Sequence, residues 1–176
     1  MAVIVVVLAF LASVAIGTLV GYGIHWTMHQ SWSGGLYRAH MQHHLVHYPA
    51  DSLYSVGHYR SSGLSSGWLT FTPFVVVAAL GVVLALHRLL HASWATDAAV
   101  LVAFVFVGGA HGVVHDAFHV SDHWLGHFGW FRHLRALHEP HHHDMSKNLG
   151  ILWFGWDRLF GSFRRHLAGS KPRESC

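Results

Sequence analysis

The chain has 176 residues, of which 52% are hydrophobic and only 11% are charged. Soluble domains carry about 25% charged residues, so the composition is typical of a membrane protein and excludes a disordered chain. The formal net charge of +3 is too small to indicate a nucleic-acid partner. A single cysteine, Cys176, excludes a disulfide framework, a cysteine zinc site and an iron–sulfur cluster held by several cysteines.

Three apolar stretches are long enough to cross a membrane. The first, 1–24, contains no charged residue, and a span through about 30 Å of hydrocarbon takes about 20 apolar residues. A cleaved secretory signal would begin with basic residues, whereas the first basic residue here is Arg38, so we expect a retained anchor. The stretches 68–86 and 98–114 flank a short polar break and predict a helical hairpin through the bilayer.

The hairpin places the two His-rich parts of the chain, 25–58 and 111–143, in one compartment, because crossing twice returns the chain to its starting side. Of the eleven Lys and Arg residues, ten lie on that side and one, Arg88, lies in the hairpin break. The positive-inside rule therefore predicts that both His-rich regions are cytoplasmic.

The predicted architecture is one all-α, multi-pass membrane domain over residues 1–176, with about three transmembrane helices. A cytosolic helical cap is expected from 25–67 and 115–163, and it holds the histidines. The basic tail, 164–176, is expected to face the lipid surface, where Lys and Arg bind anionic headgroups.

Histidine supplies 20 of the 176 residues, and many of these residues have the spacing of metal ligands. Side chains three or four residues apart share one face of a helix, and imidazole is the commonest metal ligand. Four groups stand out: His25 and His29; His40, His43 and His44; a ladder of His111, His115, His119, His123 and His127; and His138, His141, His142 and His143. A spacing of four drifts around a helix of about 3.6 residues per turn, so the whole ladder cannot face one site.

About ten well-spaced histidines exceed the needs of one ion, which takes four to six ligands, and so indicate two ions. Imidazole suits zinc, copper, iron and nickel. The isolated histidines are interpreted as surface residues: His47, His58, His87, His91, His133 and His166. The ends of the ladder have the same interpretation. Asp116, Asp122 and Asp144 are near the groups and are candidates to ligate or to accept the imidazole N–H, although each could equally be an ordinary helix-surface or capping residue.

Two other classes of metal protein remain as alternatives. His138-Glu139-Pro140-His141-His142 satisfies H-E-x-x-H, the zinc hydrolase motif, which needs both histidines on one turn of a continuous helix. Pro140 disfavours that turn, and we expect the helix to begin near Pro140. A non-redox metal-binding protein or transporter would bury polar ligands within its spans, and the first two spans are nearly free of them.

The order of the motifs, HxxxH, HxxHH, a transmembrane hairpin, HxxxH and HxxHH, resembles the fatty acid hydroxylase / sterol desaturase superfamily of integral-membrane di-iron oxygenases. The resemblance covers about residues 25–163. Its most specific part is the ending, in which His138-Glu-Pro-His141-His142 precedes Asn148-Leu-Gly and Trp156-Asp-Arg-Leu-Phe-Gly-Ser-Phe.

The resemblance implies a ligand set of His25, His29, His40, His43, His44, His119, His123, His138, His141 and His142, with His115 in reserve. It implies no catalytic residue beyond the ligands. The implied cofactor is two iron ions, which zinc can replace in purified samples, and the implied co-substrate is O₂. The implied reaction hydroxylates or desaturates an aliphatic C–H of a membrane lipid of the fatty acid or sterol type, with electrons from an external ferredoxin or cytochrome b5-type donor. Carotenoid ring hydroxylases have a similar size and similar histidine boxes but a different ending, so they are the alternative substrate class.

Aromatic residues near the boxes have two interpretations. Trp26, Trp32, Phe118 and Trp124 could line an apolar substrate pocket, or they could form the aromatic belt found where membrane proteins meet the interface. The sequence favours the belt.

Overall fold

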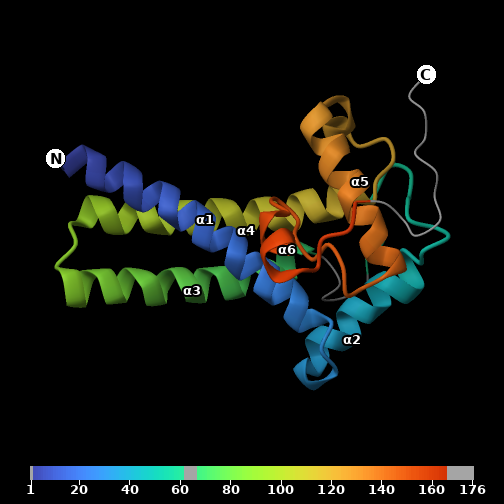
Figure 1. Cartoon of the computed structure of the whole chain (residues 1–176), viewed down its shortest axis with the longest axis horizontal. Coiled ribbons are helices and arrows are strands. Elements are labelled where there is room, and N and C mark those ends of the chain that lie inside the picture. The colour runs from blue at the N-terminus through green and yellow to red at the C-terminus, as the bar shows by residue number, and fades with distance from the viewer. Residues whose placement is uncertain (1, 62–66, 166–176) are drawn as a thin grey trace.

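The computed structural model describes residues 2–61 and 67–165, and within these ranges the regular elements are helical apart from one isolated β-bridge, Ser55 with Val120 (Figure 1). This confirms the all-α prediction. The elements in chain order are α1 (Ala2–Met28), the 3₁₀ turn η1 (Ser31–Ser33), α2 (Gly35–Gln42), the π-helical η2 (His43–His47), α3 (Gly67–Leu90), α4 (Trp94–Phe118), the 3₁₀ turn η4 (Trp124–His127), α5 (Gly129–His143) and α6 (Gly155–Phe160).

Three helices are long and apolar enough to cross a membrane: α1, the Phe71–Leu89 part of α3, and α4. Their outer faces are apolar and uncovered, with Val77 69% exposed and Phe106 65% exposed, as expected of side chains that contact lipid. The three predicted spans are confirmed as helices. All three are longer than expected, because α1 runs on to Met28, α3 covers Gly67–Leu90 and α4 extends from Trp94 to Phe118.

Glycines allow the three long helices to approach closely. A Cβ atom added at Gly17 of α1 would lie 3.1 Å from Cγ1 of Val107 in α4. One added at Gly108 of α4 would lie 2.9 Å from Cγ1 of Val75 in α3. Small residues at such crossings let helix backbones pack directly against each other within a bilayer.

The turn between α3 and α4 is held by a helix cap and by one hydrogen bond between side chains. The Ser93 side chain accepts a hydrogen bond from the Thr96 amide and so caps the start of α4. Asp97 in the first turn is buried and lies 2.7 Å from Nδ1 of His87 at the end of α3. His87 was predicted to be a simple surface residue, and it is instead partly exposed and paired.

The segments that carry the clustered histidines lie at one end of the molecule, away from His87 and His91 near the α3–α4 turn (Figure 1). The end of α1, α2, the end of α4, α5 and α6 form this cap, whereas the N-terminus and the α3–α4 turn lie at the opposite end. A small apolar core holds the cap together, formed by Val114, Ala117, Phe118, Leu125, Phe131 and Ile151. The two His-rich regions therefore meet in space, as the hairpin topology predicts.

Candidate metal centre

The end of α1 and the segment after it supply the first two imidazoles. His25 lies in the last turn of α1 and is fully buried, and His29 follows the helix end directly. The spacing of four residues places their rings 5.2 Å apart, measured between centroids. Because α1 continues past the apolar stretch as one helix, His25 is held rigidly by the membrane-spanning segment.

Three more imidazoles come from α2 and the π-helical turn that follows it. His40 lies in α2, and His43 and His44 begin η2. All three are almost completely buried, with at most 2% of each residue exposed. A π-helical turn is wider than an α-helical turn and occurs frequently at functional sites. Here it brings the adjacent residues His43 and His44 to the cluster together.

Of the ladder histidines, His115 and His119 lie in the cluster and His123 does not. His115 lies in the last turn of α4, and both it and His119 are 2% exposed. After His119 the chain leaves the helix, because the Ser55 amide donates to the His119 carbonyl at 2.8 Å and Val120 pairs with Ser55. A spacing of four residues then no longer keeps side chains on one face.

His123 is instead partly exposed and caps η4, with its Nδ1 accepting from the Leu125 amide at 3.3 Å. The preference for His123 over His115 is therefore not supported by the geometry. Two other ladder members also lie outside the cluster. His127 is exposed, whereas His111, expected at the surface, is buried in α4 and donates from Nδ1 to the Val107 carbonyl at 3.0 Å.

The second HxxHH motif lies on α5, where His138, His141 and His142 are buried. The expectation that a helix begins near Pro140 is wrong, because α5 runs without interruption from Gly129 to His143 and includes Pro140. The fixed φ of proline suits a helix, and the missing N–H leaves only one carbonyl, that of Ala136, without its usual helical donor. Ala136 is exposed, so water can reach that carbonyl.

Ten imidazoles from these four segments form three overlapping groups, and in each group the nitrogen atoms lie within 4.8 Å of one another. The groups are His25, His29, His40, His44 and His141; His43, His115, His119 and His138; and His43, His44 and His142. Nine of the ten ligands implied by the sequence are thus brought together, and His115 takes the place of His123. Each group could hold a metal ion.

Within the five-histidine group the Nε2 atoms are too crowded to form ordinary hydrogen bonds. Nε2 of His40 lies 3.1 Å from that of His25, 3.0 Å from that of His29 and 3.1 Å from that of His44. A neutral imidazole Nε2 carries either one proton or one lone pair and cannot satisfy three such contacts at once. Lone pairs that converge in this way are typical of a ligand shell.

The opposite ring nitrogen of several ligands donates to a backbone carbonyl, which fixes the ring orientation and leaves Nε2 as the lone pair. The Nδ1–O distances are 2.7 Å for His25 with Leu149, 2.7 Å for His141 with Lys147, 2.8 Å for His142 with Tyr48 and 2.9 Å for His119 with Leu53.

The Asn148–Gly150 and Trp156–Phe163 segments form the framework that holds one of these carbonyls in place. The buried Asp157 carboxylate of α6 accepts hydrogen bonds from the amides of Leu149 at 2.7 Å and Gly150 at 2.9 Å. Asn148, with a φ of +51°, donates its side-chain amide to the Leu137 carbonyl at 2.6 Å. The Asn-Leu-Gly and Trp-Asp-Arg segments therefore aim the Leu149 carbonyl at the ligand ring of α1.

Several buried nitrogens of the cluster have no hydrogen-bond partner among the described residues. They are Nε2 of His43, His115, His119 and His142, Nδ1 of His29 and His44, and both ring nitrogens of His138. An unpaired buried polar atom costs about 1–3 kcal/mol, so several of them in one place are difficult to explain in a protein that binds nothing there. A bound metal ion would satisfy the Nε2 lone pairs.

Burial also keeps the rings neutral, which is the form that binds metal. Burial is the main cause that lowers the pKa well below its ordinary value, and neighbouring imidazoles lower it further, at His40, His43, His44, His119, His138 and His141. The pKa of His29 falls to about 4, and that of His142 to about 3, in both cases mainly through burial.

Of the three aspartates near the boxes, only Asp116 touches a ligand, with Oδ1 3.3 Å from Nδ1 of His115. Asp122 is exposed and accepts from the Gly57 amide at 2.8 Å. Asp144 binds Ser146 and pairs with Arg164 at 2.9 Å. The latter two carboxylates are therefore not in contact with the cluster.

Tyr59, which the sequence did not single out, also reaches the cluster. Its hydroxyl lies 2.9 Å from Nδ1 of His43. No spacing rule connects Tyr59 to a histidine box, since it lies on a loop between α2 and α3.

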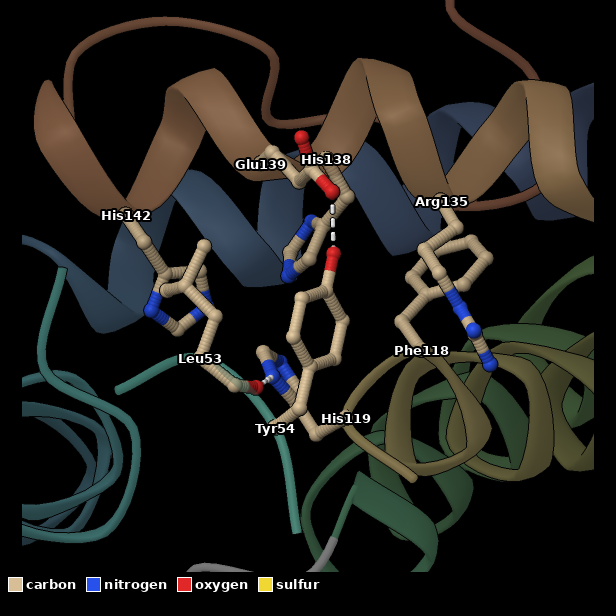
Figure 2. A pocket seen from close by; sticks show the side chains of 8 residues that line it. All are labelled: Leu53, Tyr54, Phe118, His119, Arg135, His138, Glu139 and His142. Carbon is tan, nitrogen blue, oxygen red and sulfur yellow. Dashed lines mark hydrogen bonds between the residues drawn. The ribbon is translucent and has the colours of Figure 1, made fainter. Parts of the chain in front are cut away.

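A small pocket opens onto the cluster between the 53–54 loop and α5. Figure 2 shows its wall, formed by three of the ligand histidines, His119, His138 and His142, together with Leu53, Tyr54, Phe118, Arg135 and Glu139. The Tyr54 hydroxyl donates to the Glu139 carboxylate across it.

The suggested aromatic pocket is not formed. Phe118 is buried and lines the small pocket, whereas Trp26, Trp32 and Trp124 are 45%, 70% and 63% exposed. The surface interpretation of the isolated histidines fits His58, His91 and His133, which are exposed, whereas His47 is only partly exposed and His166 lies outside the described residues.

Comparisons of the chain with protein-family models, curated proteins and solved structures find no match in any of the three. The buried imidazole cluster at one end of three apolar helices is therefore the main guide to what the protein does.

Proposed function

We propose that the ten clustered imidazoles hold two metal ions and that the chain is a membrane oxygenase acting on an aliphatic C–H of a lipid. One observation carries the proposal: ten imidazoles, nine of them buried, converge in overlapping groups with their free nitrogens turned toward each other. This is the arrangement that the resemblance to the fatty acid hydroxylase / sterol desaturase superfamily implies, with His115 in place of His123.

The number of ligands favours two ions over one. Five histidines form the first group and four form the second, whereas a single ion takes four to six ligands in all. The Nε2 separations of 3.0–3.1 Å in the first group also favour a particular geometry. With metal–nitrogen bonds of about 2.1 Å, ligands at right angles lie about 3.0 Å apart and tetrahedral ligands about 3.4 Å apart.

The proposed metal is iron. Imidazole binds iron readily, and ligands at right angles belong to five- and six-coordinate ions rather than to a closed tetrahedral zinc site. Two bound iron ions would supply the O₂ activation that amino-acid side chains cannot perform on an unactivated C–H bond. The chain itself keeps the ligand rings neutral, fixes their orientation through backbone carbonyls and surrounds them with apolar side chains such as Phe118.

The substrate is proposed to be a membrane lipid, with a fatty acid or sterol type favoured and a carotenoid as the alternative within the same chemistry. The three apolar helices hold the cluster directly at the end of the membrane-crossing part of the molecule. The distribution of Lys and Arg favours a cytoplasmic location for that end. The two electrons of each turnover are proposed to come from a separate ferredoxin or cytochrome b5-type protein.

The proposal is tested with the purified chain, loaded with iron and incubated with lipid, a reductant and ¹⁸O₂. The expected result is incorporation of one labelled oxygen atom into the lipid, or loss of two hydrogens from it, that depends strictly on both O₂ and reductant. Product formation at an equal rate without O₂ would contradict the proposal. His58→Ala is the matched control, because His58 is exposed and lies outside the cluster.

A zinc hydrolase remains a second candidate, since the structure removes the objection that Pro140 raised. His138 and His142 lie one turn apart on a continuous helix with Glu139 between them. The two histidines belong to different groups of the cluster, however, and Glu139 binds Tyr54. A zinc-loaded protein that hydrolyses lipid esters or peptides without O₂, and loses this activity in Glu139→Gln, would favour the hydrolase.

A further inference from the structure

Two side chains outside the ligand set connect two of the ligands to one carboxylate. Tyr59 lies 2.9 Å from Nδ1 of His43, and it is also hydrogen-bonded to Asp116. Asp116 in turn lies 3.3 Å from Nδ1 of His115. His43 and His115 both belong to the four-histidine group, so the connection lies entirely on one side of the cluster.

The direction of each hydrogen bond follows from the chemistry of the groups. A carboxylate only accepts, so both the Tyr59 hydroxyl and the His115 Nδ1–H donate to Asp116. The Tyr59 oxygen then accepts a hydrogen bond from the Nδ1–H of His43. Both imidazoles thereby carry their proton on Nδ1, and their Nε2 atoms, which are buried without a partner, are left as lone pairs for a metal ion.

The position of Asp116 is unfavourable for the helix that carries it. Asp116 lies in the last turn of α4, where the backbone carbonyls place partial negative charge. An acidic residue gains no helix stability there, so its contacts with Tyr59 and His115 provide the more direct reason for a carboxylate at this place.

The five-histidine group has a different kind of support. The acceptors that orient its rings are the neutral backbone carbonyls of Leu149 and Lys147, and among the described residues none of its hydrogen-bond partners is a carboxylate. Two rings of the five-histidine group are thus oriented by neutral dipoles, whereas the four-histidine group has an ionised side chain at His115 in addition to the neutral Leu53 carbonyl at His119.

We propose that Tyr59 and Asp116 are positioning residues for the four-histidine group and that the charge of Asp116 makes the two metal positions unequal, with the higher affinity for a cation on the His43–His115 side. An anionic acceptor makes an imidazole a stronger donor than a neutral carbonyl does. This inference rests on the proposed function only in requiring that the cluster binds two ions.

The test is a cobalt(II) titration of the full-length protein in detergent, followed by equilibrium dialysis and by the visible absorption of bound cobalt. Wild-type protein is expected to bind two ions with distinct affinities. Asp116→Asn, which keeps the size but removes the charge, should weaken one of the two ions about 10–100-fold, change its absorption band and leave the other ion unaltered.

Tyr59→Phe should weaken the same ion to a smaller extent, and it provides the test if Asp116→Asn does not fold. The double variant should bind no more weakly than Asp116→Asn alone, because both changes break one chain of hydrogen bonds. Asp51→Asn is the matched control, since it removes a charge from an exposed carboxylate and should leave both ions unchanged.

Two ions in the wild type with unchanged binding in Asp116→Asn, or with both ions weakened equally, would overturn the inference while leaving the proposed function intact. A wild-type protein that binds no ion would instead remove the proposed function and the inference together.

Discussion

Replacing His115 and His123 with alanine, one at a time, tests which of the two is a metal ligand. The geometry favours His115, and the resemblance implies His123. His115 is 2% exposed and belongs to the four-histidine group, whereas His123 is partly exposed and lies outside all three groups. Losing even an outer hydrogen-bond partner of a ligand typically costs about 10–100-fold in metal affinity. Removal of the ligand itself should cost at least that much, which corresponds to about 1.4–2.7 kcal/mol or more.

The measurement is the metal content of each purified variant, by elemental mass spectrometry, after dialysis against a weak chelator. His115→Ala is expected to retain about half of the wild-type metal because one of two positions is lost. His123→Ala should retain all of it, because its ring stacks on Phe131 and caps η4 rather than facing the cluster. The reverse pattern, with metal lost in His123→Ala and kept in His115→Ala, would refute the assignment of His115 as a ligand.

Three further outcomes are expected. The metal-free protein should lose stability as the pH falls from about 6.5 toward 4, because the unfolded chain takes up protons that the folded cluster excludes. His29, with a pKa of about 4, accounts for about 3 kcal/mol of this loss. A denaturation midpoint that does not change over this pH range would contradict the expected loss. Asp157→Ala should lower the melting temperature, because the Leu149 and Gly150 amides lose a charged acceptor worth about 1.5–3 kcal/mol each. The control Asp51→Ala should leave the melting temperature unchanged. Equal melting temperatures for the two variants would argue against the role of Asp157 in holding Leu149 and Gly150. Glu139→Gln should keep its full metal content, as measured by elemental analysis, and loss of metal would make Glu139 part of the centre.

The three long helices could be predicted from the sequence because length and apolar composition are local properties. A run of about 20 apolar residues without charge has few alternatives to a membrane-spanning helix. Their ends were less predictable, since α1 and α4 continue into the cap beyond the apolar residues. That continuation is what places His25 and His115 on the same rigid helices as the spans.

Most of the cluster was also predictable, because the spacing of three or four residues is a local consequence of helix geometry. The rule failed at His123, where the chain leaves the helix after His119 to pair with Ser55. That pairing joins residues far apart in the sequence, so no local sequence pattern indicates it. The spacing of His115, four residues before His119, was the available signal for the pair that the structure brings together.

The groups that orient the ligands could not be predicted, for two physical reasons. Backbone carbonyls such as that of Leu149 carry no side-chain signature in a sequence. Tyr59 reaches His43 only because the loop between α2 and α3 folds back on η2. The continuation of α5 through Pro140 was not predicted because proline usually disfavours the interior of a helix, and here the helix tolerates it.

The most direct test of the central claim is the number and kind of metal ligands in the iron-loaded protein, measured by elemental analysis together with X-ray absorption at the iron edge. The account predicts about two ions per chain, each surrounded by nitrogen donors at about 2.1 Å with the scattering pattern of imidazole. A protein that binds no iron, binds one ion only, or surrounds its iron mainly with oxygen or sulfur would contradict it.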